Sequence, residues 1–107
     1  MAHTEIGKYS VSVYGAGGIP EGARIWLNGT DGSTIGTIIL YKDPAALQNK
    51  DDHQTSSGFV AIHQSADQLP KFLDVLRNEK PVFLGFASSW KTGYITTGQE
   101  PVGEEET

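Results

Sequence analysis

The sequence predicts an α+β protein that is mainly β: an antiparallel sheet of six strands, either open or rolled into a sandwich or barrel, with one helix packed on it. Three observations predict this class. Most apolar residues lie in short segments where they alternate with polar residues, which is the period of a strand. Clusters of Gly, Asn and Pro separate these segments, as in hairpin turns. Only one stretch carries apolar residues at the period of a helix.

The predicted helix covers Gln68–Asn78. Its apolar side chains recur at i, i+3, i+4 and i+7 and form one stripe: Leu69, Phe72, Leu73 and Leu76. A helix of about eleven residues is marginal by itself in water, so we expect this stripe to dock on something. The rest of the chain offers mainly strands for that contact.

Pro70 decides where this helix begins. If Ser65 were the N-cap, Pro70 would lie inside the helix, where its missing N–H breaks a backbone hydrogen bond. If Asp67 is the N-cap, Pro70 lies in the first turn, where that N–H would be unpaired anyway. We therefore expect Asp67 to cap the helix. At the other end, Asn78 tolerates the left-handed conformation that stops a helix, and Pro81 keeps the residue before it from continuing one.

Six segments have strand periodicity, in the order βββ, long loop, βαββ: Lys8–Tyr14, Ala23–Asn28, Ile35–Lys42, Phe59–Gln64, Val82–Ala87 and Lys91–Thr97. Turn-forming connections between the first three strands and between the last two predict antiparallel hairpins. The helix lies between the fourth and fifth strands, an order that also fits a right-handed crossover between parallel strands. Ile35–Lys42 has too continuous an apolar run for a half-exposed strand, so we expect it at the centre of the sheet.

The long loop and the C-terminus are polar. Asn49–Ser57 contains no apolar residue, which predicts an exposed loop of unusual length, either functional or disordered. We expect residues 1–98 to form a single domain and residues 99–107 to form an acidic, mobile tail.

Composition excludes several classes of function. The chain has 107 residues and no cysteine, which excludes disulfides, Cys-ligated metals and thiol catalysis. Its net charge of −5 and scattered basic residues argue against a surface for nucleic acid or for anionic membranes. We find no signal-peptide pattern and no apolar run long enough to span a bilayer, so we expect a cytoplasmic protein. No cofactor and no bound metal are expected.

The histidines are the first candidates for chemistry. His53 follows Asp51 and Asp52, so these three residues offer metal ligands, or a base that a carboxylate orients. Further ligands at a metal-binding spacing are missing, and we prefer a solvated polar loop. His63 lies on a strand, either facing a pocket or hydrogen-bonded within the protein. The glycine-rich segment 15–18 is typical of a hairpin loop, because a strand rather than a helix follows it.

The aromatic residues indicate a binding surface more directly than the histidines do. Trp26 and Arg24 alternate away from the apolar face of their strand, and Tyr14 does the same at the end of its own. Trp90 and Tyr94 belong to the last hairpin. If the helix covers only one face of the sheet, rings on the other face are open to a partner. Six residues are therefore candidates for binding: Tyr14, Arg24, Trp26, His63, Trp90 and Tyr94.

These observations favour a non-catalytic binding or interaction module. We expect it to self-associate, as a homodimer, or to hold another protein through an aromatic-bearing sheet face or an edge strand. Two alternatives stay open. A small-molecule binder would stack a carbohydrate or a nucleotide on Trp26 or Trp90. A small metal-dependent or His-based hydrolase would need His53 and His63 to converge.

Overall fold

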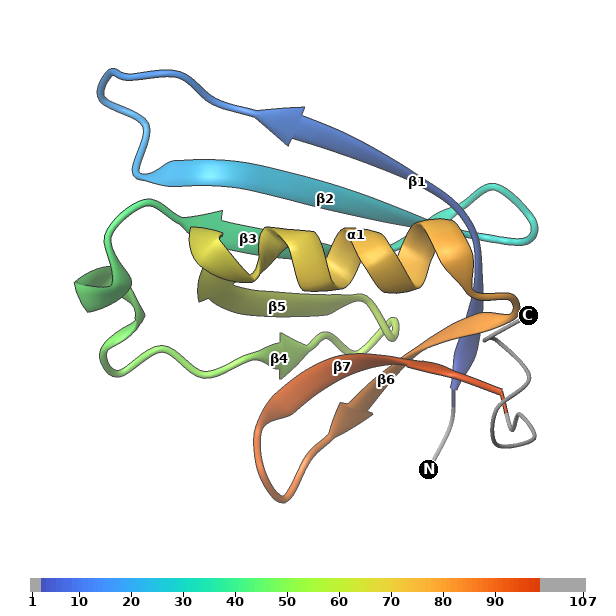
Figure 1. Ribbon diagram of the computed structural model, residues 1–107. Helices are drawn as coiled ribbons and strands as arrows, with labels where there is room; N and C mark the ends of the chain where they lie inside the picture. Colours follow the sequence, from blue (N-terminus) through green and yellow to red (C-terminus); the bar gives the residue numbers. More distant parts are fainter. Residues whose placement is uncertain (1–2, 99–107) are drawn as a thin grey trace, which may run out of the picture.

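A computed structural model describes residues 3–98. Within this range the chain forms seven strands and one α-helix (Figure 1). Their bounds are β1 Thr4–Val13, β2 Glu21–Gly29, β3 Thr34–Tyr41, β4 His53–Gln54, β5 Val60–Ser65, α1 Leu69–Asn78, β6 Val82–Ala87 and β7 Thr92–Thr97. Two short 3-10 helices cover Pro44–Leu47 and Ala66–Gln68. The tail expected at residues 99–107 lies outside the described residues.

The strands form one mixed sheet in the order β4-β5-β3-β2-β1-β6-β7. The predicted class, mainly β with one helix on a sheet, is confirmed, and so are the antiparallel hairpins β1–β2, β2–β3 and β6–β7. The predicted number of six strands was wrong, because two residues of the polar loop pair with β5 as the short strand β4. The sheet stays open rather than closing into a barrel.

One strand pair is parallel. It is not β5 with β6, the two strands for which the sequence left a parallel crossover open. β5 and β6 flank the helix, but β3, β2 and β1 lie between them in the sheet. β3 and β5 pair in parallel instead, from Gly36 with Val60 to Tyr41 with Ser65. Two parallel neighbours need a long connection, and the polar segment 42–59 supplies it. β3 is central, as predicted, and its residues Gly36–Tyr41 are buried.

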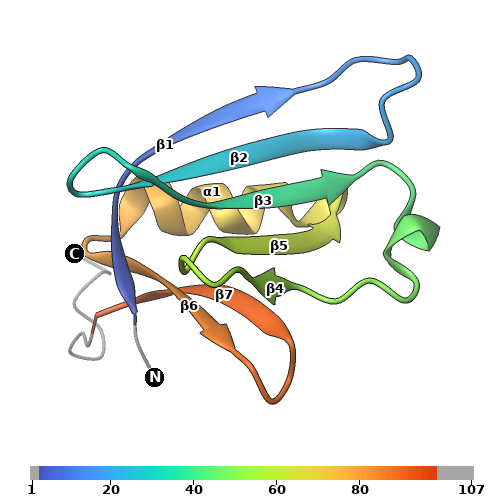
Figure 2. The same cartoon turned by 180° about the vertical axis from the view of Figure 1, so that it is seen from behind.

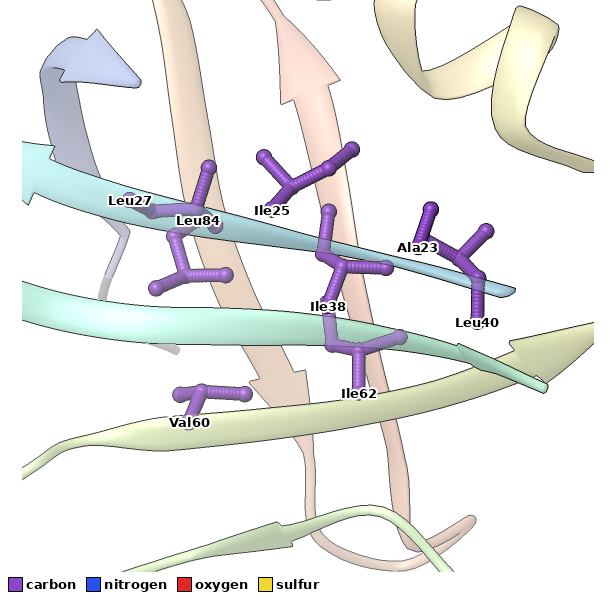
Figure 3. Close-up of a cluster of buried hydrophobic side chains, with 8 residues drawn as sticks. All are labelled: Ala23, Ile25, Leu27, Ile38, Leu40, Val60, Ile62 and Leu84. Atoms are coloured by element: carbon purple, nitrogen blue, oxygen red, sulfur yellow. The ribbon is translucent and has the colours of Figure 1, made fainter. Parts of the chain in front are cut away.

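The core lies on one face of the sheet, where α1 and the β6–β7 hairpin both pack (Figures 1 and 3). The buried cluster consists of Ala23, Ile25, Leu27, Ile38, Leu40, Val60, Ile62 and Leu84. The predicted stripe of α1 packs against this cluster. Gly36 lets β6 approach β3, because a Cβ at this position would lie 2.7 Å from Cδ2 of Leu84. One face of the sheet is therefore covered twice, by the helix and by the last hairpin.

The ends of the helix differ from the prediction in detail. α1 begins one residue later than predicted and has Gln68 as its N-cap, so the assignment of Asp67 as the cap was wrong. A 3-10 turn leads into the helix from Ser65, whose hydroxyl donates to the carboxylate of Asp67. The helix ends at Asn78 as predicted, but through the extended residue Glu79 (φ −111°) rather than through a left-handed Asn78.

Asp52 links the two ends of the open sheet. One carboxylate oxygen accepts the backbone N–H of His63 at 2.7 Å, and the other accepts the backbone N–H of Gly93 at 2.8 Å. The N–H of Asp52 donates to the carbonyl oxygen of Lys91 at 3.2 Å. The polar loop therefore joins β5 to β7, which are not hydrogen-bonded neighbours in the sheet.

Candidate functional site

In the described part of the chain, no helix packs on the second face of the sheet, which we call the outer face (Figure 2). Directly opposite residues of paired strands share a face, and Arg24, Ile39 and His63 are opposite one another across β2, β3 and β5. Since alternate residues of a strand point to the same side, the central part of the outer face follows from this row: Arg24, Trp26, Thr37, Ile39, Tyr41, Ala61 and His63.

Trp26 is the exposed residue in the central part of the outer face, and Arg24 lies beside it. The guanidinium carbon of Arg24 lies 5.0 Å from the centroid of the Trp26 ring, at cation–π distance. Glu21 accepts two hydrogen bonds from the same guanidinium, at 3.1 and 2.9 Å. The indole is 36% exposed although it lies in the middle of the second strand. A bidentate ion pair therefore holds a cation beside a large aromatic ring that solvent still reaches.

A second group of rings lies on β3, β4 and β5. The hydroxyl of Tyr41 is 2.9 Å from Nδ1 of His63, and the two rings are stacked at 5.8 Å between centroids. The ring of His53 lies 6.3 Å from that of His63, and Nζ of Lys50 lies 5.5 Å from the centre of the Tyr41 ring. This group extends the outer face from Trp26 toward the edge formed by β4.

Burial sets the protonation of this group. It lowers the pKa of His63 below the usual 6.5, and the carboxylate of Asp52 opposes part of that shift. Burial, together with the charge of Glu21, raises the pKa of Tyr41 above its usual 10.0. At neutral pH both side chains are therefore uncharged, and they form a neutral hydrogen bond.

The rings of His53 and His63 lie close together, as the hydrolase hypothesis requires. The carboxylates near them, however, bind other groups. Both oxygens of Asp52 accept backbone N–H groups, and Asp51 pairs with Lys91 at 3.9 Å. Among residues 3–98, no group of three or more side chains is placed to hold a metal ion. Within residues 3–98, neither ring has a hydrogen-bonded carboxylate of the kind that orients a general base.

The six predicted binding residues do not lie in one place. Arg24, Trp26 and His63 lie together on the outer face, while the others lie elsewhere. Trp90 is 80% exposed in the turn between β6 and β7. The ring of Tyr94 lies over Gly85, and its hydroxyl bonds to His3 at 2.9 Å. Tyr14 follows β1 in the connection to β2.

Sequence reasoning missed the residues that complete the outer face. Glu21 contacts Arg24 from three residues earlier on the same strand, and Tyr41 contacts His63 from a strand 22 residues away in the chain. Alternation along β3 places Ile39 and Tyr41 on one side, but only the strand register shows that this is the side of Arg24 and His63. The parallel pairing of β3 with β5, together with the β2–β3 register, was the missing information.

The structure also has a groove, lined by β1 on one side and by the end of α1 and the start of β6 on the other. Its volume is about 790 Å³. Its lining combines apolar residues, among them Ile6, Tyr9, Leu76 and Pro81, with residues of both charges, among them Glu5, Lys8, Arg77, Glu79 and Lys80. None of the outer-face residues lines this groove, so the groove is separate from the outer face.

Comparisons with known proteins add no relative: no family model, no curated protein and no solved structure matches this chain. In the described part of the chain, no helix is long and apolar enough to cross a membrane. The functional argument therefore depends on the geometry of the chain itself.

Proposed function

We propose that this chain is a non-catalytic binding module that holds a protein partner on its outer face. The observation that carries the proposal is the stacked pair of Arg24 and Trp26 on a sheet face without a helix. Tryptophan, tyrosine and arginine are the side chains that most often dominate the binding energy of protein interfaces. Trp26 and Arg24 bring two of these types to this surface, whereas Tyr41 of the same face is only 9% exposed.

The rigidity of this surface supports the same proposal. Arg24 is already fixed by Glu21, and Tyr41 is fixed by His63. Side chains that are held before binding lose less conformational entropy when a partner covers them. They are also carried by neighbouring strands of a sheet, which positions them more precisely than a loop does. The outer face is thus preorganised for contact.

Affinity capture with matched variants tests this function. The wild-type chain and a Trp26→Ala variant are immobilised and exposed to an extract of the cells that make the protein, and bound proteins are quantified. We expect at least one protein to bind the wild-type chain and to be lost with Trp26→Ala. Trp90→Ala serves as the control, because Trp90 is also exposed but lies in the β6–β7 turn. Equal retention on all three chains would contradict the proposal.

A second candidate function is favoured by one observation. The indole of Trp90 is 80% exposed, and such a ring is a platform on which a sugar or a nucleobase stacks. Fluorescence titration with sugars and nucleotides separates the two candidates. A Trp26→Phe variant, which keeps Trp90, responds if small molecules bind there. No response leaves the protein partner as the candidate.

A further inference from the structure

Most of β1 has a free edge. β2 pairs with residues 8–13 of β1 on one side, whereas β6 pairs on the other side only with Thr4 and Glu5. In Figure 1, no described segment lies beyond β1 along the rest of that edge. A long unpaired edge is uncommon, because its N–H and C=O groups form a template for another strand.

The direction of these free groups follows from one hydrogen bond. The N–H of Tyr14, the residue after β1, donates to the carbonyl oxygen of Gly22 in β2 at 2.9 Å. Along an antiparallel strand, successive residues turn their backbone groups to opposite sides. Ser10 and Ser12 therefore bond to β2, while three residues present their N–H and C=O groups at the free edge: Tyr9, Val11 and Val13.

Exposed apolar side chains lie at one end of this edge, and the groove lies at the other end. Val13 is 71% exposed and Ile19, in the connection between β1 and β2, is 49% exposed. The groove begins beside Tyr9 and continues along Ile6 toward Leu76. Along β1, exposed Val13 and the start of the groove beside Tyr9 thus lie on opposite sides of Val11.

We propose that a second copy of this chain pairs with the free edge, β1 against β1 in antiparallel orientation, with Val11 on the two-fold axis. Backbone groups permit only registers in which outward-facing residues meet one another. Placing Val11 opposite itself pairs Tyr9 with the partner's Val13 and uses all three outward-facing residues. A register shifted toward the N-terminus would use Gly7, where the regular pairing of β1 is interrupted.

This register accounts for the features at both ends of the edge. Val13 gains contact with the partner's Tyr9, which shields an apolar side chain that is now largely in water. Beyond Val13, the partner's chain reaches the point where β6 occupies the edge at Glu5, so it must leave the sheet. The groove lies at that point, and the partner's Ile19 supplies an apolar side chain that contacts it. Lys8 faces the partner's Tyr14, so no like charges meet.

The proposed dimer does not depend on the outer face. Tyr9 and Val11 pack against the core cluster, so this pairing joins the two sheets edge to edge and leaves Trp26 open on the other side. The function proposed above and the dimer therefore fail or succeed separately: Trp26→Ala leaves the dimer intact, and a monomer is still able to bind a protein through its outer face.

Sedimentation velocity over a range of protein concentration tests the dimer. We expect the wild-type chain to sediment as a dimer at high micromolar concentration and Val13→Lys to raise the dissociation constant at least tenfold. Ser89→Lys is the charge-matched control, because Ser89 is exposed in the β6–β7 turn. A wild-type chain that stays a monomer, or a dimer that Val13→Lys leaves unchanged, would overturn the proposal.

Cysteine cross-linking tests the register and does not depend on how well Val13→Lys folds. The chain has no cysteine of its own, so any disulfide that forms must involve the introduced cysteine. Opposite residues that share hydrogen bonds lie about 5.5 Å apart at Cα, a spacing that a disulfide spans. Val11→Cys should cross-link on oxidation, Val13→Cys alone should not, and Tyr9→Cys with Val13→Cys should. Cross-linking of Val13→Cys as fast as Val11→Cys would overturn this register.

Discussion

The guanidinium of Arg24 lies over the ring of Trp26, with the guanidinium carbon 5.0 Å from the ring centroid. The two side chains are two residues apart on β2, so the strand itself places them on the same side. Glu21 fixes the guanidinium from the other direction with two hydrogen bonds. This contact decides how much of the indole a quencher or a partner reaches.

Removing the cation should expose the indole further. In a chain with Trp90→Phe, so that only Trp26 fluoresces, we expect Arg24→Ala to increase quenching by acrylamide, because the guanidinium no longer covers part of the ring. Lys71→Ala, a substitution on the exposed side of α1, serves as the control and should change nothing. Unchanged quenching after Arg24→Ala would show that the two side chains are not stacked in solution.

Asp52 should contribute strongly to stability although it lies in a loop. Asp52→Ala leaves the backbone N–H groups of His63 and Gly93 without their acceptor, which should lower the free energy of unfolding by about 1–3 kcal/mol. Urea denaturation measures this change. Asp51→Ala is the matched control, because its ion pair with Lys91 is long (3.9 Å) and exposed, and it should cost less than about 0.5 kcal/mol. Equal losses for the two variants would contradict the bridging role of Asp52.

The close approach of β6 to β3 depends on a missing side chain. A Cβ at position 36 would lie 2.7 Å from both Leu84 Cδ2 and the carbonyl oxygen of Val60, so Gly36→Ala should destabilise the fold by about 1–3 kcal/mol. Gly18→Ala has open space around its Cβ and should have little effect. A thermal melt compares the two variants. If Gly36→Ala were as stable as the wild-type chain, β6 would not cross β3 as closely as described.

The pKa of His63 predicts a loss of stability in mild acid. Burial lowers this pKa below 6.5 in the folded chain, so the unfolded chain takes up the proton first as the pH falls. The contribution is complete above pH 6.5 and decreases below it. Four charged or titratable groups act on this imidazole: Asp52, Lys50, His53 and Arg24.

Comparison with His63→Gln isolates this effect from other titrating groups. The difference in the free energy of unfolding, wild type minus His63→Gln, should decrease between pH 7.5 and pH 5, because only the wild-type chain has this imidazole to protonate. Urea denaturation at each pH gives the difference. If it stayed constant or increased as the pH fell, the imidazole would not be buried in its neutral form.

The side that each residue faces was predictable from the sequence, because alternation along a strand is a local property. Ile25 and Leu27 lie in the core, with Trp26 on the other face, as the pattern indicates. The stripe of α1 was equally readable, because Pro70 and the apolar spacing lie within one segment. Local patterns thus predicted α1 and the strands of the described residues other than β4.

Relations between distant segments were not predictable. The strand β4 forms because β5 offers an edge and Asp52 anchors the loop, and neither cause is visible within the polar loop itself. The contact between Tyr41 and His63 depends on the parallel register of β3 and β5. The sequence pattern does not specify such a register between segments that are separated by a long loop.

Protection of Trp26 by a bound partner is the measurement that tests the central claim most directly. The Trp90→Phe chain is mixed with the protein that the wild-type chain captures, and acrylamide quenching of Trp26 is compared in the free and the bound states. The account predicts that binding lowers the quenching severalfold, while a Trp26→Phe chain, which reports on Trp90, shows no change. Quenching of Trp26 that is the same in both states would contradict the claim that the outer face binds the partner.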